Sequence, residues 1–327
     1  MKRGYHAGGL RQMGAQLGIL TEDACEEIHL ATLEVLERTG VWVEADDALD
    51  VYADAGCEVD REHRIVRIPP YVVDEAIRKA PATQTCGARN PENDMVLSGR
   101  RVTFTNFSTG VNVNDIETGE RRASTSQDVH DIGVLVDWAD QIDFYFAAVT
   151  ANEAPAETQG LHGYAAALSS TSKPVWPALE TVAEFEAAYQ IAALVAGGED
   201  AVRERQFISS GGCTVSPLRL PKTMTDVTMW GARKGLATGA LCMTMAGGSG
   251  PATMAGTIVV GNAELLAALV LVQAVQPGLS YLYSTSGTFM DMRYGVCPVG
   301  SPEAAFMNTG IAALARYYML PSWVAGL

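Results

Sequence analysis

From about residue 100 onward, short apolar runs alternate with segments of helical periodicity. Seven runs typical of buried strands start about 30 to 42 residues apart, at 102–105, 144–147, 174–176, 207–209, 240–243, 281–283 and 322–324. Segments with helical spacing of apolar residues lie between them, at 126–138, 158–168, 182–196, 223–234, 253–275 and 302–318. This interval suits one strand, one helix and two loops, and apolar strands predict a parallel sheet covered on both faces. Seven such units favour an α/β fold of the (β/α)8 TIM-barrel type over an open sheet.

Residues 1–100 follow a different pattern. Apolar residues at helical spacing predict a helix over 22–39, capped by Thr21 and ended by Gly40, and another over 45–55. Alternation predicts a short strand at 65–68, and a third helix follows over 71–79. We therefore expect a helical N-terminal region with a small hairpin over 1–100 and a barrel domain over 101–327.

The strand count falls one short of a complete barrel. A closed barrel has no edge strands, whereas seven strands leave two edges unpaired. Residues 320–327 read as the interior of a buried strand that runs into its loop rather than as a polar chain end. We expect either an unrecognised strand or a sequence that stops before the barrel closes.

Composition excludes several classes of partner. With 38 acidic against 23 basic residues, the chain of 327 residues has a formal charge of −15, which argues against binding nucleic acid. The stretch between Lys234 and Asp291 carries only Glu264 as a charge, but glycine and proline interrupt it, so buried elements are expected rather than a membrane span.

Residues 1–6 contain no apolar core of a secretory signal. Six scattered cysteines without a CxxC pair predict a reducing, cytoplasmic location and no metal site.

Catalytic groups of such barrels lie on the loops that follow the strands. The glycine-rich loop at 247–251 lacks the spacing of a phosphate-binding loop, so a tight turn is the better interpretation. Cys213 ends a strand run, but no histidine follows a run at that face, so an activated thiol is not expected.

Glu303 is the most interesting acid, because Ser301-Pro302-Glu303 places a carboxylate at a helix N-terminus beside the expected cleft. Ordinary helix capping explains the same residues equally well, and both interpretations stay open. Asp291 is better explained by an ion pair with Arg293 than by catalysis. Tyr283, Phe289 and Trp176 could form an aromatic wall for a methylated ammonium group, although core packing accounts for each of them singly.

Several segments together resemble the trimethylamine methyltransferase family. They are 106–112, 213–218 (CTVSPL), 246–251 (AGGSGP), 254–257 (MAGT), 262–264 (NAE), the Asp291 segment, 300–303 (GSPE) and 320–326 (LPSWVAG). The resemblance covers essentially the whole chain. It implies a (β/α)8 barrel that moves a methyl group from trimethylamine to the cobalt(I) corrinoid of a separate small protein, in methylamine catabolism or methanogenesis, with no permanently bound cofactor.

The resemblance also implies roles for particular residues. Trimethylamine-specific members carry pyrrolysine, encoded by an amber codon, and here that residue would come directly after Leu327. We expect the sequence to be a translation stopped at that codon. Glu303 is the candidate that stabilises the cationic amine, Tyr283 and Phe289 offer aromatic faces, and Asn106 and Ser286 offer polar contacts, with Asp291 nearby.

Two alternatives stay open. A glycine betaine (quaternary amine) methyltransferase of the same chemistry predicts no pyrrolysine and an Arg or Lys in the cleft that binds the substrate carboxylate. A non-catalytic truncated barrel predicts a chain that is stable by itself despite its open edges. The partners expected are a methylated amine, a cognate corrinoid protein and further copies of the chain in a homo-oligomer, without nucleic acid or membrane.

Overall fold

The apolar runs and helical segments form two units in the computed structural model, which describes residues 18–99 and 101–326. Unit 1 comprises described residues 85–209 apart from residue 100, and unit 2 comprises described residues 18–84 and 210–326. Residues 1–6, where no secretory signal is expected, and Leu327 lie outside the described residues. The domain boundary expected near residue 100 stays a prediction.

Unit 2 contains a parallel sheet in the order β10-β12-β14-β16. Its strands are β10 (Ser210–Cys213), β12 (Thr238–Cys242), β14 (Tyr281–Thr285) and β16 (Ser322–Val324), and they match the last four predicted runs. Only β10 differs from its predicted position: it starts directly after the apolar run 207–209 rather than within it. The helices between the strands are α8 (Lys222–Lys234), α9 (Met254–Val275) and α10 (Pro302–Tyr317).

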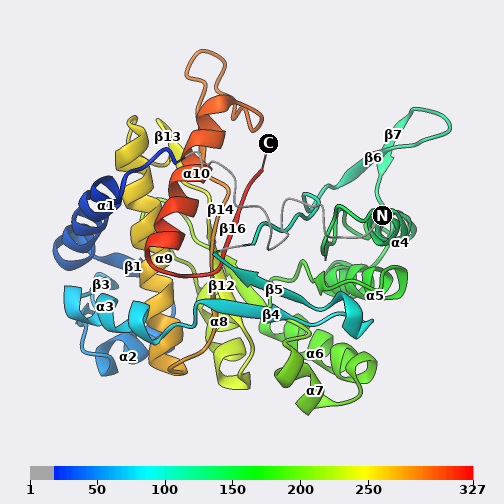
Figure 1. The fold of residues 1–327 in the computed structure, drawn as a ribbon, viewed down its shortest axis with the longest axis horizontal. Coiled ribbons are helices and arrows are strands. Elements are labelled where there is room, and N and C mark those ends of the chain that lie inside the picture. Colours follow the sequence, from blue (N-terminus) through cyan, green and yellow to red (C-terminus); the bar gives the residue numbers. More distant parts are fainter. Residues whose placement is uncertain (1–17, 100, 327) are drawn as a thin grey trace. The chain divides into compact units, whose positions relative to one another are not determined.

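α9 forms the centre of the unit 2 core. It contacts β12 and β14 of the sheet and also α1, α2 and α3 of the N-terminal segment (Figure 1). It is long and apolar enough to cross a membrane, with a mean hydropathy of 2.1, but 78% of that window is buried within the protein. Because other elements cover it on several sides, α9 is the core helix of an α/β domain, as expected for a helix whose one charged residue is Glu264.

The N-terminal helices have the bounds that the pattern predicts, within a residue or two. They are α1 (Glu22–Glu34), continued by one π-helical turn, η2 (Val35–Thr39), and then α2 (Asp46–Asp54) and α3 (Pro70–Lys79). Thr21 caps α1 by accepting the N–H of Ala24. A small sheet in the order β11-β1-β3-β2 joins them, from β1 (Val41–Val43), β2 (Glu58–Asp60), β3 (Ile65–Arg67) and β11 (Arg219–Leu220). Since β1 pairs in parallel with β11, the N-terminal layer is tied directly to the segment after β10.

Unit 1 contains the first three predicted strand positions. Residue 105 forms a parallel bridge to Phe144, and β8 (Tyr145–Phe146) pairs in parallel with β9 (Val175–Trp176). The helices of this unit are α4 (Ser126–Trp138), η4 (Ala156–Thr158), α5 (Gln159–Ser170), α6 (Val182–Ala196) and α7 (Glu199–Arg205). Further short elements were not predicted: η3 (Pro91–Asn93), β5 (Met95–Ser98) and the hairpin of β6 (Asn112–Asn114) and β7 (Arg121–Ala123). The strand β4 (Thr83–Cys86), which includes the last two residues of unit 2 before residue 85, was not predicted either.

Candidate functional site

The carboxyl ends of the four parallel strands of unit 2 bring neighbouring residues into rows. Paired residues of a sheet face the same side, so the register defines two opposite rows across the strands. One row, which includes core residues, is Gly212, Ala240, Tyr283 and Ser322. The other row, on the opposite face, is Cys213, Leu241, Ser284 and Trp323. This second row faces away from α9, because Tyr283 of the first row contacts Asn262 of α9. Barrels of this class bind substrate at the carboxyl ends of their strands, and Cys213 ends β10.

The loops that follow β12 and β14 run side by side. The N–H groups of Ser286, Thr288 and Met290 donate to the carbonyl oxygens of Cys242, Thr244 and Ala246, at 2.9, 3.2 and 3.0 Å. Two short strands continue this ladder, β13 (Met245–Ala246) and β15 (Thr288–Phe289). The carboxyl edge of the sheet is thus an ordered platform.

A buried carboxyl group lies next to this platform. Glu264 of α9 is 0% exposed, and its Oε2 accepts hydrogen bonds from the hydroxyls of Thr214 (2.5 Å) and Ser216 (2.9 Å). The N–H of Leu218 donates to Oε1 at 2.9 Å. Burial raises the pKa of Glu264 above its usual range, and the three donors oppose this shift. Burial, with the charge of Glu264 as a smaller cause, also raises the pKa of the Cys242 thiol to about 12, so that thiol is not a nucleophile at neutral pH.

The raised pKa of Glu264 predicts a pH-dependent effect of Glu264→Gln on stability. Between the ordinary pKa of an unfolded glutamate and the raised value, the folded protein keeps a proton that the unfolded chain releases. Across this window, a rise in pH therefore lowers the unfolding free energy of wild type relative to that of the variant. We expect the variant-minus-wild-type difference to increase with pH, by about 1.4 kcal/mol for each unit by which the pKa is raised. Urea unfolding from pH 4 to pH 8 measures it, and a difference that does not change with pH would contradict it.

The structure separates the predicted site residues of unit 2 into two groups. Ser286 is partly buried on the loop after β14, and its hydroxyl makes no hydrogen bond to any described residue, so it is available to a ligand. Phe289 of β15 is half-buried at the edge of the core. Glu303 is exposed in the first turn of α10, which contacts β15. These three residues lie on neighbouring parts of the carboxyl edge.

Tyr283 belongs to the core instead. Its side chain is 0% exposed, its ring packs edge-on against Tyr318, and its hydroxyl donates to Asn262 Oδ1 at 2.5 Å. Residue 283 stands in the row that contains core residues, so its ring offers no face to a ligand here. The core-packing interpretation is the one that the geometry supports.

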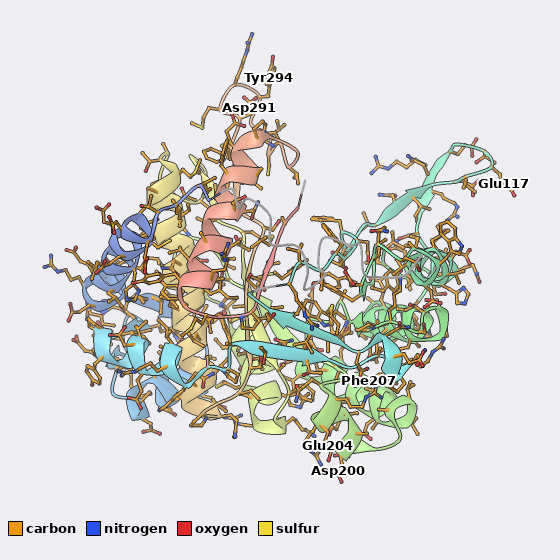
Figure 2. All side chains as sticks on the ribbon, in the orientation of Figure 1. Glu117, Asp200, Glu204, Phe207, Asp291 and Tyr294 are labelled. Atoms are coloured by element: carbon orange, nitrogen blue, oxygen red, sulfur yellow. The ribbon has the colours of Figure 1, made fainter. Side chains whose placement is uncertain are left out.

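Asp291 has a local structural role. Its Oδ1 accepts the N–H groups of Arg293 and Tyr294, at 2.9 and 3.2 Å, and its main chain bridges to Val296. Figure 2 shows Asp291 and Tyr294 together on the loop before α10. The predicted ion pair with Arg293 is not among the ion pairs of the described residues, because the carboxylate binds main-chain N–H groups and the guanidinium of Arg293 stacks on the Tyr294 ring.

Asn106 holds two strand ends of unit 1 together. Its Nδ2 donates to the carbonyl oxygen of Phe146 at 2.6 Å, and its Oδ1 accepts the N–H of the same residue at 3.2 Å. Trp176 of the predicted aromatic wall lies in the same unit, against Phe144 and Phe146. The side-chain amide of Asn106 is thus occupied by main-chain groups at the carboxyl end of β8.

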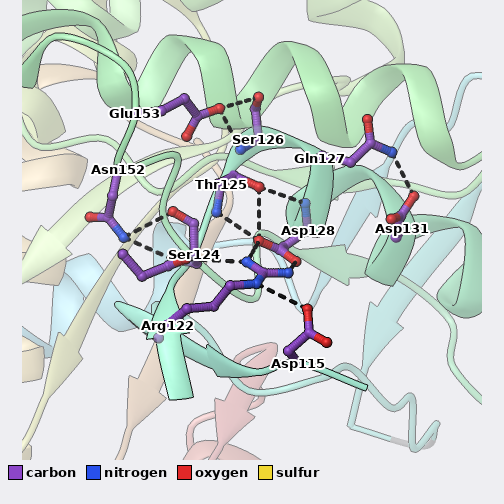
Figure 3. Close-up of polar contacts among 12 residues, drawn as sticks. Asp115, Arg122, Ser124, Thr125, Ser126, Gln127, Asp128, Asp131, Asn152 and Glu153 are labelled. Atoms are coloured by element: carbon purple, nitrogen blue, oxygen red, sulfur yellow. Dashed lines mark hydrogen bonds and ion pairs between the residues drawn. The ribbon is translucent and has the colours of Figure 1, made fainter. Parts of the chain in front are cut away.

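A cluster of charged residues in unit 1 also has a structural explanation. Arg122 of β7 forms two hydrogen bonds with Asp128 of α4, at 2.7 and 2.8 Å, and pairs with Asp115 at 3.2 Å (Figure 3). Arg122 holds the pKa of Asp128 at about 2. Asp128 is also part of the capping box with Thr125, so the cluster joins the β6-β7 hairpin to the N-terminus of α4.

Comparison with known proteins identifies the family. The family model of trimethylamine methyltransferase (MTTB) matches residues 4–327. The chain belongs to the trimethylamine methyltransferase family. The resemblance inferred from the sequence segments is therefore confirmed.

Individual curated proteins are similar to nearly the whole chain. Trimethylamine methyltransferase MttB of Desulfitobacterium hafniense is 41% identical over 98% of this chain and 64% of its own length. The MttB protein of Methanosarcina thermophila is 36% identical over 96% of this chain and 66% of its own length. A glycine betaine methyltransferase of Desulfitobacterium hafniense is 31% identical over 96% of this chain and 65% of its own length. The chain thus spans slightly less than two thirds of the length of these relatives.

A solved structure confirms the fold class. The crystal structure of the Methanosarcina barkeri monomethylamine methyltransferase matches with a TM-score of 0.53 and 12% identity, over 92% of this chain and 65% of that one. The predicted (β/α)8-type fold is confirmed by this likeness, and the described residues contribute three parallel strand positions in unit 1 and four in unit 2.

The sequence analysis did not predict a role for Glu264 in the site. The signal was its position as the only charged residue between Lys234 and Asp291, within an apolar helix. A lone carboxyl group there requires donors from another element, and the segment 214–218 supplies them. Among residues 18–99 and 101–326, no three His, Cys, Asp or Glu side chains gather into a possible metal site.

Proposed function

We propose that this protein transfers a methyl group from trimethylamine to the cobalt(I) corrinoid of a partner protein. In the reaction the C–N bond breaks and a C–Co bond forms. Protonated trimethylamine leaves as dimethylamine, the electron pair of the broken bond stays on nitrogen, and cobalt(I) becomes methylcobalt(III). The amine leaves only while it carries positive charge, so the site must favour the cation and exclude groups that repel it.

One observation supports trimethylamine over glycine betaine as the substrate. Residues 235–290, which include β12, β14 and the loops after them as far as Met290, contain no Lys or Arg. The next basic residue, Arg293, lies over the Tyr294 ring. The row of Cys213, Leu241, Ser284 and Trp323 is also uncharged. Trimethylamine has no carboxylate and needs no cationic partner, whereas betaine does. The glycine betaine methyltransferase among the relatives makes betaine the second candidate.

We assign the polar contacts of this reaction to the residues on the carboxyl edge of unit 2. Glu303, exposed in the first turn of α10, is the proposed electrostatic partner of the ammonium group. Ser286 offers a hydroxyl, and Phe289 offers a half-buried ring that attracts a methylated cation through its quadrupole. Asp291 orders the loop before α10, and Asn106 orders the strand ends of unit 1, both through main-chain groups.

The partners and the location are part of the same proposal. The corrinoid arrives as a substrate on its own protein, and the chain acts as a homo-oligomer. We place it in the cytoplasm, where the six cysteines, none of which forms a disulfide in the structure, stay reduced. A pyrrolysine outside residues 1–327 would bind unprotonated trimethylamine through its imine carbon, which makes the nitrogen cationic in place of the proton. The intact mass of the protein from its native host tests that residue, and a mass of 34.8 kDa would exclude it.

Glu303→Gln tests the proposed electrostatic role. Removing the negative charge while keeping the shape is expected to lower kcat for trimethylamine by about 10- to 100-fold, because an oriented charge stabilises the cationic transition state by about 1.4 to 2.7 kcal/mol. The measurement is the rate of cobalt methylation by protein from the native host, with Glu117→Gln, an exposed glutamate between β6 and β7 of unit 1, as the control. Equal rates for both variants would leave Glu303 as a capping residue only.

The substrate class is tested in the same assay. We expect trimethylamine to methylate the corrinoid protein and glycine betaine to give less than a hundredth of that rate. Efficient turnover of betaine and none of trimethylamine would overturn the choice of substrate.

A further inference from the structure

The carboxyl group of Glu264 gathers its hydrogen-bond donors from a single short segment, residues 214–218. Thr214 and Ser216 donate to one oxygen, and the main-chain N–H of Leu218 donates to the other. Glu264 is fully buried on α9, so these contacts replace the water that an exposed carboxylate would bind. Both oxygens are therefore committed to the position of the segment that follows β10.

The contacts fix which side chains of this segment face the site. Thr214 and Ser216 point to Glu264, and the residues that alternate with them, Cys213 and Val215, are exposed, Val215 by 48%. Alternation is expected because successive side chains of an extended chain point to opposite sides. Cys213 stands in the row with Leu241 and Ser284 and is the last residue of β10, at the carboxyl edge proposed to bind substrate.

A second link extends the effect of Glu264 to the neighbouring loops. The hydroxyls of Ser216 and Thr244 lie 3.0 Å apart, and the carbonyl oxygen of Thr244 accepts the N–H of Thr288. One carboxyl group thus connects the loop after β10 with the loops after β12 and β14. These are the loops that carry the proposed substrate contacts.

We propose that Glu264 is a positioning residue, which holds residues 213–218 so that Cys213 and Val215 form one wall of the amine site. This inference rests on the proposed function, because the wall matters for activity only if the substrate binds at this edge. Glu264 does not touch the substrate, and its effect passes through Thr214 and Ser216.

The experiment removes one donor at a time. Thr214→Val and Ser216→Ala each delete a hydrogen bond to Glu264 and keep the size of the side chain close to the original. Thr228→Val is the matched control, because Thr228 is fully buried in α8 of the same unit and its hydroxyl has no partner among the described residues. We expect kcat/KM for trimethylamine to fall about tenfold in the two test variants and less than twofold in the control.

Substitutions of Glu264 itself give the rescue. The amide of Glu264→Gln can still accept the Leu218 N–H through its oxygen and donate to the two hydroxyls, whereas Glu264→Asp is too short to reach both sets of donors. We expect the order wild type, Gln, Asp for kcat/KM, measured on the folded fraction. A purely structural role would change the melting temperature without this order.

The alkylation rate of Cys213 tests the positioning without any activity. The measurement uses a Cys297→Ser background, which removes the other exposed thiol. Relative to this background alone, we expect the rate at which N-ethylmaleimide modifies Cys213 to change at least threefold in Thr214→Val and Ser216→Ala. The rate should not change in Thr228→Val. Equal alkylation rates in all variants would overturn the proposal. If wild type transfers no methyl group, the proposed function fails, and the alkylation rates still decide whether Glu264 positions the segment.

Discussion

Gly211→Ala is expected to disrupt the parallel sheet of unit 2. Gly211 lies in β10 with φ of +151°, and a Cβ at this position would lie 2.3 Å from the carbonyl oxygen of Gly239 in β12. The obstacle is main chain of a paired strand, so it cannot rotate away. Backbone strain and overpacking together should lower the unfolding free energy by about 3 to 5 kcal/mol. The melting temperature and the urea midpoint of the purified variant measure the loss.

Gly300→Ala is the matched control for this substitution. A Cβ added at Gly300 would meet no atom within 4 Å, and the residue does not require a positive φ. We expect its stability to stay within about 0.5 kcal/mol of wild type. A melting temperature of Gly211→Ala equal to that of Gly300→Ala would mean that β10 and β12 do not pair as described.

Asn262→Leu should be nearly as damaging, because it breaks a buried hydrogen-bond network. Asn262 of α9 donates from Nδ2 to Thr32 of α1 and to the hydroxyl of Tyr318, both at 2.9 Å, and it accepts from Tyr283 at 2.5 Å. All four residues are buried. Leucine leaves the buried Tyr283 hydroxyl without its acceptor, while Thr32 and Tyr318 each lose one contact and keep those to the Ile28 carbonyl and to His29. The expected loss of unfolding free energy is about 3 to 4 kcal/mol.

A double-mutant cycle with Tyr283→Phe tests the explanation. Tyr283→Phe alone removes one donor and should cost about 1 to 2 kcal/mol. In the double variant the Tyr283 hydroxyl is no longer stranded, so the combined loss should be smaller than the sum by more than about 0.5 kcal/mol. Strict additivity of the two losses would show that the two side chains do not interact.

The sequence predicts helices well where local contacts decide their ends. The bounds of α4 and α6 agree with the pattern because capping boxes, Thr125 with Asp128 and Thr181 with Glu184, define their first turns. The helix α7 and the β6-β7 hairpin carry weaker periodic signals. α7 begins after Gly197 and Gly198, both with positive φ. The short strands β11, β13 and β15 depend on pairing with segments that are distant in the sequence.

The site is harder to predict because the direction of a side chain depends on the register. Tyr283 and Ser284 are neighbours in the same strand, but one packs in the core and the other faces the opposite side of the sheet. A strand position alone cannot distinguish them. Glu264 shows the same limit, since a lone charge in an apolar helix indicates a buried contact but does not identify the segment 214–218 as its partner.

The most direct test of the proposed function is the stoichiometry of methyl transfer. Protein from the native host would be mixed with carbon-13-labelled trimethylamine and its corrinoid protein reduced to cobalt(I). We expect one labelled methylcobalt(III) for each dimethylamine released, seen by the absorbance of cobalt and by NMR. The absence of labelled methylcobalt from trimethylamine would contradict the proposed function, whether or not a parallel reaction with labelled glycine betaine transfers its label.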